Sequence, residues 1–164
     1  REKGAPYGVG LPVPPAIDLE SYMVDVPGYT KSQVGAGIEY DMSARYTKRI
    51  GQTVIVEIYR RADEADARAW VDQIQFSPGV ESRGWNSTTF MGYPASVKSV
   101  TYTASDNLNE EIFLRVAVGN LGVFSKFTQS VRKSDADLLL HPEVARAMVD
   151  EVTAAVVKAI EESQ

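Results

Sequence analysis

The stretch that decides the fold is residues 38–60, which read IEYDMSARYT at 38–47, KRIG at 48–51 and QTVIVEIYR at 52–60. Apolar residues occupy every second position of the first segment, and a period of two places alternate side chains on opposite faces of a β-strand. The third segment is rich in β-branched residues, and the short segment between the two contains a glycine. These residues therefore predict a β-hairpin, with Ile38, Tyr40, Met42, Ala44 and Tyr46 on its apolar face.

Further elements follow the hairpin. Asp63 can cap a helix that Pro78-Gly79 would end, and its apolar residues recur at helical spacing. Strands are expected over 88–95, 97–104 and 110–118, and a strand end with a short helix over 123–140. Pro142 suits the first turn of a final helix that carries an apolar stripe. The segment 17–26 fits either a strand or a helical turn.

The order of these elements indicates the α+β class. Consecutive strands joined by short loops form antiparallel sheets, and helices that intervene only twice do not suit a doubly wound fold. We expect an antiparallel sheet of about five to six strands. The helices, including a long C-terminal helix, are expected to pack on one face of it.

The N-terminal segment has a different composition. Residues 1–15 hold three Gly and four Pro, which indicates an extended arm or linker before a single α+β domain at 16–164. Because the chain begins with Arg1 rather than Met, we expect either that a tag or leader was removed, in one form from a lipid-anchored precursor, or that the chain is a fragment. The expected location is extracytoplasmic (secreted, periplasmic or cell-surface), and a cytoplasmic location stays open. No apolar run approaches the length of a membrane span.

Composition argues against several classes of protein. The 17 Lys and Arg against 22 Asp and Glu give a net charge of −5, which disfavours nucleic acid as a partner. The chain has no Cys and one His, so we predict neither a metal site nor a cofactor. His141 directly precedes the helix-starting Pro142, and helix capping or simple exposure is its plainer role.

Candidate site residues come from the polar faces of the expected strands and from aromatic residues near chain breaks. The candidates are Arg45, Glu57, Tyr59, Trp85, Tyr93 and Arg115. On one interpretation they form a platform for a ligand or a partner chain. On the other they belong to an ordinary solvated sheet face, on which Glu57 pairs with Arg45 or Arg115 across neighbouring strands.

The segment Phe90-Met91-Gly92-Tyr93-Pro94-Ala95 follows the first helix and leads into a strand. This corner, followed by two strands and a C-terminal helix, resembles the PsbP/DcrB-like family of small extracytoplasmic α+β domains. The resemblance covers residues 38–160. It implies a secreted protein or lipoprotein with a binding or assembly role and no catalytic centre.

Three functions remain open from the sequence. The first is a non-catalytic extracytoplasmic binding or accessory domain, whose ligand or protein partner the sequence does not name. The second is a small enzyme with a dispersed site, in which Arg45 or Arg115 holds an anionic substrate and Glu57 acts as the base. The third is a self-associating subunit that uses a strand edge or the C-terminal helix.

Overall fold

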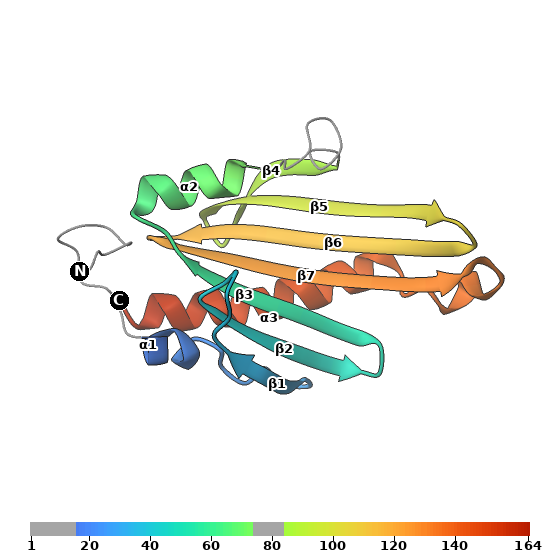
Figure 1. Cartoon of the computed structure of the whole chain (residues 1–164), viewed down its shortest axis with the longest axis horizontal. Coiled ribbons are helices and arrows are strands. Elements are labelled where there is room, and N and C mark those ends of the chain that lie inside the picture. Colours follow the sequence, from blue (N-terminus) through green and yellow to red (C-terminus); the bar gives the residue numbers. More distant parts are fainter. Residues whose placement is uncertain (1–15, 74–83) are drawn as a thin grey trace.

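The computed structural model describes residues 16–73 and 84–164, and it contains a seven-stranded antiparallel sheet in the order β1-β2-β3-β7-β6-β5-β4 (Figure 1). The strands are β1 (Thr30–Gly35), β2 (Met42–Arg49), β3 (Gln52–Arg60), β4 (Trp85–Phe90), β5 (Tyr93–Ala104), β6 (Asn107–Val118) and β7 (Leu121–Arg132). Three helices, α1 (Ala16–Ser21), α2 (Glu64–Asp72) and α3 (Pro142–Glu162), and a 3₁₀ helix, η1 (Lys133–Leu138), accompany the sheet.

Two-residue loops join most of the consecutive strands. The loops are Ile50-Gly51, Met91-Gly92, Ser105-Asp106 and Gly119-Asn120, as the residue pairs that flank them show. Each loop contains at least one residue with positive φ, which tight hairpins need to match the twist of their strands. The chain therefore forms two meanders, β1-β2-β3 and β4-β5-β6-β7, which meet where β3 pairs with β7.

The main core lies between one face of the sheet and α3. Alternate residues of β3 and β6, among them Val56, Ile58 and Leu114, are fully buried against the apolar stripe of α3. In Figure 1 this helix passes behind the strands. The start of the described chain joins the same layer, because Ser163 at the end of α3 donates a hydrogen bond to Tyr22 at 3.1 Å.

A smaller core lies on the opposite face of the sheet, under α2. Ala67, Trp70 and Val71 of this helix pack with Ala117 of β6, and Phe124 of β7 contacts the cluster. The α+β class, the antiparallel sheet and the long C-terminal helix are confirmed, but the expectation that the helices share one face is wrong. The reason is topological: α2 belongs to the connection that leaves β3 in the middle of the sheet and leads to β4 at its edge.

The sheet also has more strands, and different strand limits, than the sequence predicted. β1 was not expected. The strand end and short helix predicted over 123–140 are present as β7, which is longer than expected and begins at Leu121, and as η1 (Lys133–Leu138). β2 begins at Met42, so Ile38 lies in the preceding loop and its side chain is fully exposed.

No helix in the described part of the chain is long and apolar enough to cross a membrane. The predicted arm at residues 1–15 and the helix stop at Pro78-Gly79 lie outside the described residues.

Candidate functional site

Two hollows lie side by side on the face of the sheet that carries α2. The aromatic hollow, of about 430 Å³, is lined by Glu39, Tyr59, Arg61, Trp70, Trp85, Lys98, Phe113, Arg115 and Phe124. The adjoining hollow, of about 550 Å³, is lined by Arg45, Gly51, Thr53, Ile55, Phe113, Lys126 and Thr128. Phe113 borders both hollows, so they adjoin along this face, and we call the two together the groove.

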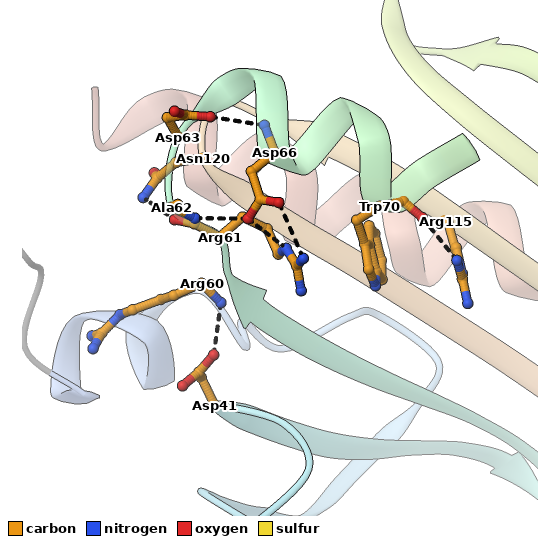
Figure 2. Close-up of polar contacts among 9 residues, drawn as sticks. All are labelled: Asp41, Arg60, Arg61, Ala62, Asp63, Asp66, Trp70, Arg115 and Asn120. Carbon is orange, nitrogen blue, oxygen red and sulfur yellow. Dashed lines mark hydrogen bonds and ion pairs between the residues drawn. The ribbon is translucent and has the colours of Figure 1, made fainter. Parts of the chain in front are cut away.

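Arg115 forms the floor of the aromatic hollow and fixes the C-terminal end of α2. Its side chain is only 6% exposed. Its Nη1 donates hydrogen bonds to the main-chain oxygens of Gln73 and of Trp70, the latter at 2.8 Å (Figure 2). A cation at the end of a helix also interacts favourably with the helix dipole. Burial lowers the pKa of Arg115, and the guanidinium nevertheless stays charged because its ordinary pKa is so high.

The guanidinium of Arg115 lies among aromatic rings. Its Cζ is 5.0 Å from the ring centroid of Trp70, 5.3 Å from that of Trp85 and 5.9 Å from that of Phe124. Cation–π attraction strengthens when the cation is withdrawn from water. Arg115 therefore joins β4, β7 and α2 through one side chain, and it holds the three rings at the edge of the hollow.

The N-terminal end of α2 is fixed by a second polar cluster, which Figure 2 shows beside the start of the helix. Asp63 caps α2, as the sequence predicted, by accepting a hydrogen bond from the main-chain nitrogen of Asp66 at 2.8 Å. The carboxylate of Asp66 accepts hydrogen bonds from the Ala62 nitrogen and, at 3.1 Å, from Arg61 Nε. The Ala62 bond, followed by Arg61, lowers the pKa of Asp66 despite some desolvation. The C-terminal end of α2 is thus bonded to β6 through Arg115, and its N-terminal end is bonded to Arg61, the residue that follows β3.

Glu57 and Tyr59 form a hydrogen-bonded pair beside the aromatic hollow. The hydroxyl of Tyr59 donates to Glu57 Oε1 at 2.6 Å, and Lys126 Nζ lies 3.5 Å from Glu57 Oε2. Burial, and then the bond to Glu57, raises the pKa of Tyr59 above its usual range. The Tyr59 hydroxyl therefore stays protonated and donates this hydrogen bond at physiological pH.

A row of six side chains crosses the sheet at right angles to the strands. The register pairs Trp85 with Lys98, Lys98 with Phe113, Phe113 with Lys126, Lys126 with Ile55, and Ile55 with Arg45. We call these six residues the transverse row. Apolar and cationic side chains alternate along it, and paired residues of neighbouring strands project from the same face. Lys98 Nζ also lies 3.4 Å from Glu111 Oε1.

The structure brings most of the predicted site residues together. Tyr59, Trp85 and Arg115 line the aromatic hollow, Glu57 is bonded to Tyr59, and Arg45 lines the adjoining hollow. The expected pairing of Glu57 with Arg45 or Arg115 in neighbouring strands is wrong, because the register places Ser43 and Phe124 opposite Glu57.

Tyr93 lies on the other face of the sheet. Its hydroxyl donates to Glu161 Oε2 of α3 at 2.6 Å, and its ring packs against the main core. Tyr93 does not join Trp85, because side chains along a strand point alternately to its two faces. Trp85 pairs with Lys98 and so shares its face, and Tyr93 lies five positions before Lys98 in β5, on the opposite face.

The sequence reasoning did not select several residues that line the groove. These are Trp70, Lys98, Phe113, Phe124 and Lys126. The alternation that predicts β6 already places Phe113 on the same face as Arg115, although it was not chosen as a site residue. Lys126 and Phe124 lie in β7, which was not predicted as a strand over its full length.

Two further features concern metals and the lone histidine. Within residues 16–73 and 84–164, no group of three or more His, Cys, Asp or Glu side chains is arranged to hold a metal ion. His141 Nδ1 accepts a hydrogen bond from the main-chain nitrogen of Glu143 at 3.3 Å and so caps α3. The capping role predicted for His141 is therefore confirmed.

Comparison with known proteins gives little. No protein-family model matches the chain, and no curated protein matches it. A protein from Bacteroides thetaiotaomicron, known from a crystal structure at 1.50 Å resolution, is similar with a TM-score of 0.45 and 10% sequence identity. The match covers 65% of this chain and 36% of that chain, so the present chain corresponds to a little over a third of that protein. The similarity is too distant to carry an argument about function.

Proposed function

We propose that the protein is a non-catalytic binding domain whose ligand lies in the groove on the α2 face of the sheet. The observation that carries the proposal is the half-buried ring of Phe113, which borders both hollows and lies next to the rings of Trp85 and Phe124. Ligand sites typically combine such apolar surface with a few polar groups that fix orientation. Lys98, Tyr59 and Arg61 supply those groups here.

The contacts of the polar residues favour binding over catalysis. Arg115 is bound to the backbone of α2, and Glu57 already accepts from Tyr59 and faces Lys126. An enzyme acting on an anionic substrate would need Arg45 or Arg115 to hold that substrate beside Glu57 as the base. Arg115 is bonded to the main chain of α2, and the register does not pair Arg45 with Glu57, which makes this alternative the weaker one.

The location of this binding activity is also a proposal. The resemblance of the 90–95 corner to PsbP/DcrB-like domains and the composition of residues 1–15 support work outside the cytoplasm. Separation of the producing cells into cytoplasmic, membrane and extracytoplasmic fractions, followed by immunodetection, tests it. Recovery in the cytoplasmic fraction alone would contradict this part of the proposal without affecting the binding site.

The binding proposal is tested by ligand enrichment. The wild-type protein and the Trp85→Ala variant are equilibrated with a small-molecule extract of cells and medium, and the compounds retained by each are identified by mass spectrometry. Thr88→Ala, an exposed position in the same strand, serves as the control variant. We expect at least one compound that the wild type and Thr88→Ala retain unchanged and Trp85→Ala loses.

Two outcomes would overturn the proposal. One is an identical set of retained compounds for the wild type and Trp85→Ala. The other is chemical conversion of the retained compound by the wild type, because turnover would favour the enzyme instead.

A further inference from the structure

We infer that the ligand of the groove is a linear oligosaccharide without a high charge, which lies across the strands along the transverse row from Trp85 to Arg45. The inference rests on the proposed function and names the chemical class of its ligand. It follows from three observations: the geometry of the row, the flat aromatic surfaces within it, and the way in which its charges are paired.

The geometry of the row suits an extended chain. Its six residues lie on six neighbouring strands, so the row spans five interstrand spacings, about 24 Å at about 4.8 Å each. A pyranose ring in a linear chain advances by a distance close to one such spacing. A short linear oligomer therefore has the length to run along the row and across both hollows.

The aromatic members supply flat surfaces at the right places. Trp85 stands at one end of the row and Phe113 near its middle, with their ring centroids 6.1 Å apart. The faces of aromatic rings carry partial negative charge, and the C–H groups on a sugar face carry partial positive charge. The two centroids are about one pyranose advance apart, so neighbouring sugar rings can stack on Trp85 and Phe113. Lys98 Nζ lies over the Phe113 ring, 5.5 Å from its centroid, and there it can bind the hydroxyl groups of a sugar that stacks on this ring.

The charges of the row argue for hydroxyl groups in preference to phosphates or carboxylates. Lys98 lies 3.4 Å from Glu111, and Lys126 lies 3.5 Å from Glu57. A polyanion would meet these carboxylates as well as the ammonium groups, and like charges repel. A sugar hydroxyl both donates and accepts hydrogen bonds, so it can bind the ammonium and the carboxylate of the same pair. The net charge of −5 also disfavours a polyanion.

The test uses defined oligosaccharides. Cellohexaose, laminarihexaose and maltohexaose are titrated into the protein, with their disaccharides, hexagalacturonate and the single-stranded oligonucleotide dT6 for comparison. Trp70 and Trp85 are the only tryptophans in the chain, and both line the aromatic hollow. Their fluorescence therefore reports directly on the groove, and isothermal titration calorimetry gives the affinity. We expect at least one neutral hexasaccharide to bind at least tenfold more tightly than its disaccharide.

Variants locate the binding on the row. Phe113→Leu keeps an apolar side chain but removes the flat ring, and Lys126→Ala removes an ammonium; each should weaken hexasaccharide binding at least fivefold. Phe90→Leu and Lys158→Ala make the same chemical changes on the α3 side of the molecule, and they should bind as the wild type does. Equal weakening by Phe113→Leu and Phe90→Leu would contradict the assignment to the row.

The negative outcomes separate this inference from the proposed function. If none of the hexasaccharides binds at millimolar concentration while ligand enrichment recovers a non-carbohydrate compound that depends on Trp85, the oligosaccharide assignment is wrong and the binding domain stands. Preference for hexagalacturonate or dT6 would also overturn the assignment, in favour of a polyanion. If the hexasaccharides fail and enrichment recovers nothing, both proposals fail.

Discussion

The indole of Trp70 lies directly on the backbone of Gly122. A Cβ atom added to this glycine would stand 2.7 Å from Trp70 Cε3, closer than side-chain packing allows. Gly122 belongs to β7 and Trp70 to α2, so the absence of a side chain at one position of the sheet lets the helix approach it. This contact sets the depth of α2 on the sheet, and with it the shape of the aromatic hollow that Trp70 lines.

Gly122→Ala should destabilise the protein. The methyl group must displace Trp70, and overpacking of this kind costs about 1–3 kcal/mol, which outweighs the gain of about 0.5–1 kcal/mol from replacing Gly by Ala in a strand. Urea denaturation measures the free energy of unfolding. Gly35→Ala is the matched control, since nothing lies within 4 Å of a Cβ at that strand position. Equal stability of the two variants would show that α2 does not rest on Gly122.

Arg115→Met should loosen the C-terminal end of α2. The change keeps an elongated apolar side chain but removes the donor to the main-chain oxygens of Trp70 and Gln73, at a cost of about 1.5–3 kcal/mol for hydrogen bonds that involve a charged group. Arg68→Met removes an exposed arginine from the same helix and should change stability by less than about 0.5 kcal/mol. The expectation fails if thermal or chemical denaturation does not distinguish the two variants.

Thr153 and Ser125 should be energetically coupled. Both side chains are fully buried between α3 and β7, and their hydroxyl oxygens are 2.6 Å apart. Thr153→Val leaves the buried Ser125 hydroxyl without that partner and costs about 1–3 kcal/mol, whereas in Ser125→Ala the Thr153 hydroxyl keeps its hydrogen bond to the main-chain oxygen of Val149. Removing both hydroxyls should therefore be less harmful than the sum of the single changes. The free energies of unfolding of Thr153→Val, Ser125→Ala and the double variant form the measurement. Strict additivity would contradict the coupling.

Glu110 should make the protein less stable as the pH rises. Its side chain is 0% exposed, Oε1 accepts a hydrogen bond from Gln129, and Oε2 has no hydrogen-bond partner among the residues that the structure describes. Burial raises the pKa of Glu110 above its ordinary 4.5, although Gln129 and His141 act in the opposite direction. Between the unfolded and folded pKa values the folded state therefore holds a proton that the unfolded state has released, and stability falls with rising pH in that window.

Glu110→Gln tests this pH dependence. The amide keeps an acceptor for Gln129 and does not ionise, so the free energy of unfolding of the variant should fall less than that of the wild type as the pH rises above about 4.5. Glu162→Gln, an exposed position at the end of α3, should follow the wild-type profile. Parallel profiles for the wild type and Glu110→Gln would mean that Glu110 does not titrate in this way.

Much of the fold follows from local sequence pattern. The alternation in 52–60 and 110–118 assigns a core face to each strand, and Val54, Val56, Ile112 and Leu114 are buried on that face. Asp63 and His141 cap the helices that they precede. These features depend on neighbours within a few residues along the chain, which is why the sequence alone determines them.

The groove and its transverse row depend on tertiary structure. A period of two assigns faces within one strand, but it does not align Lys98 with Phe113 and Lys126 on neighbouring strands. That alignment comes from strand pairing and loop length, and a shift of one residue would turn each side chain to the opposite face. The pairing of β4 with β5 likewise places Tyr93 and Trp85 on opposite faces of the sheet. The placement of α2 opposite α3 comes from the path between β3 and β4, a relation between distant segments that no local pattern carries.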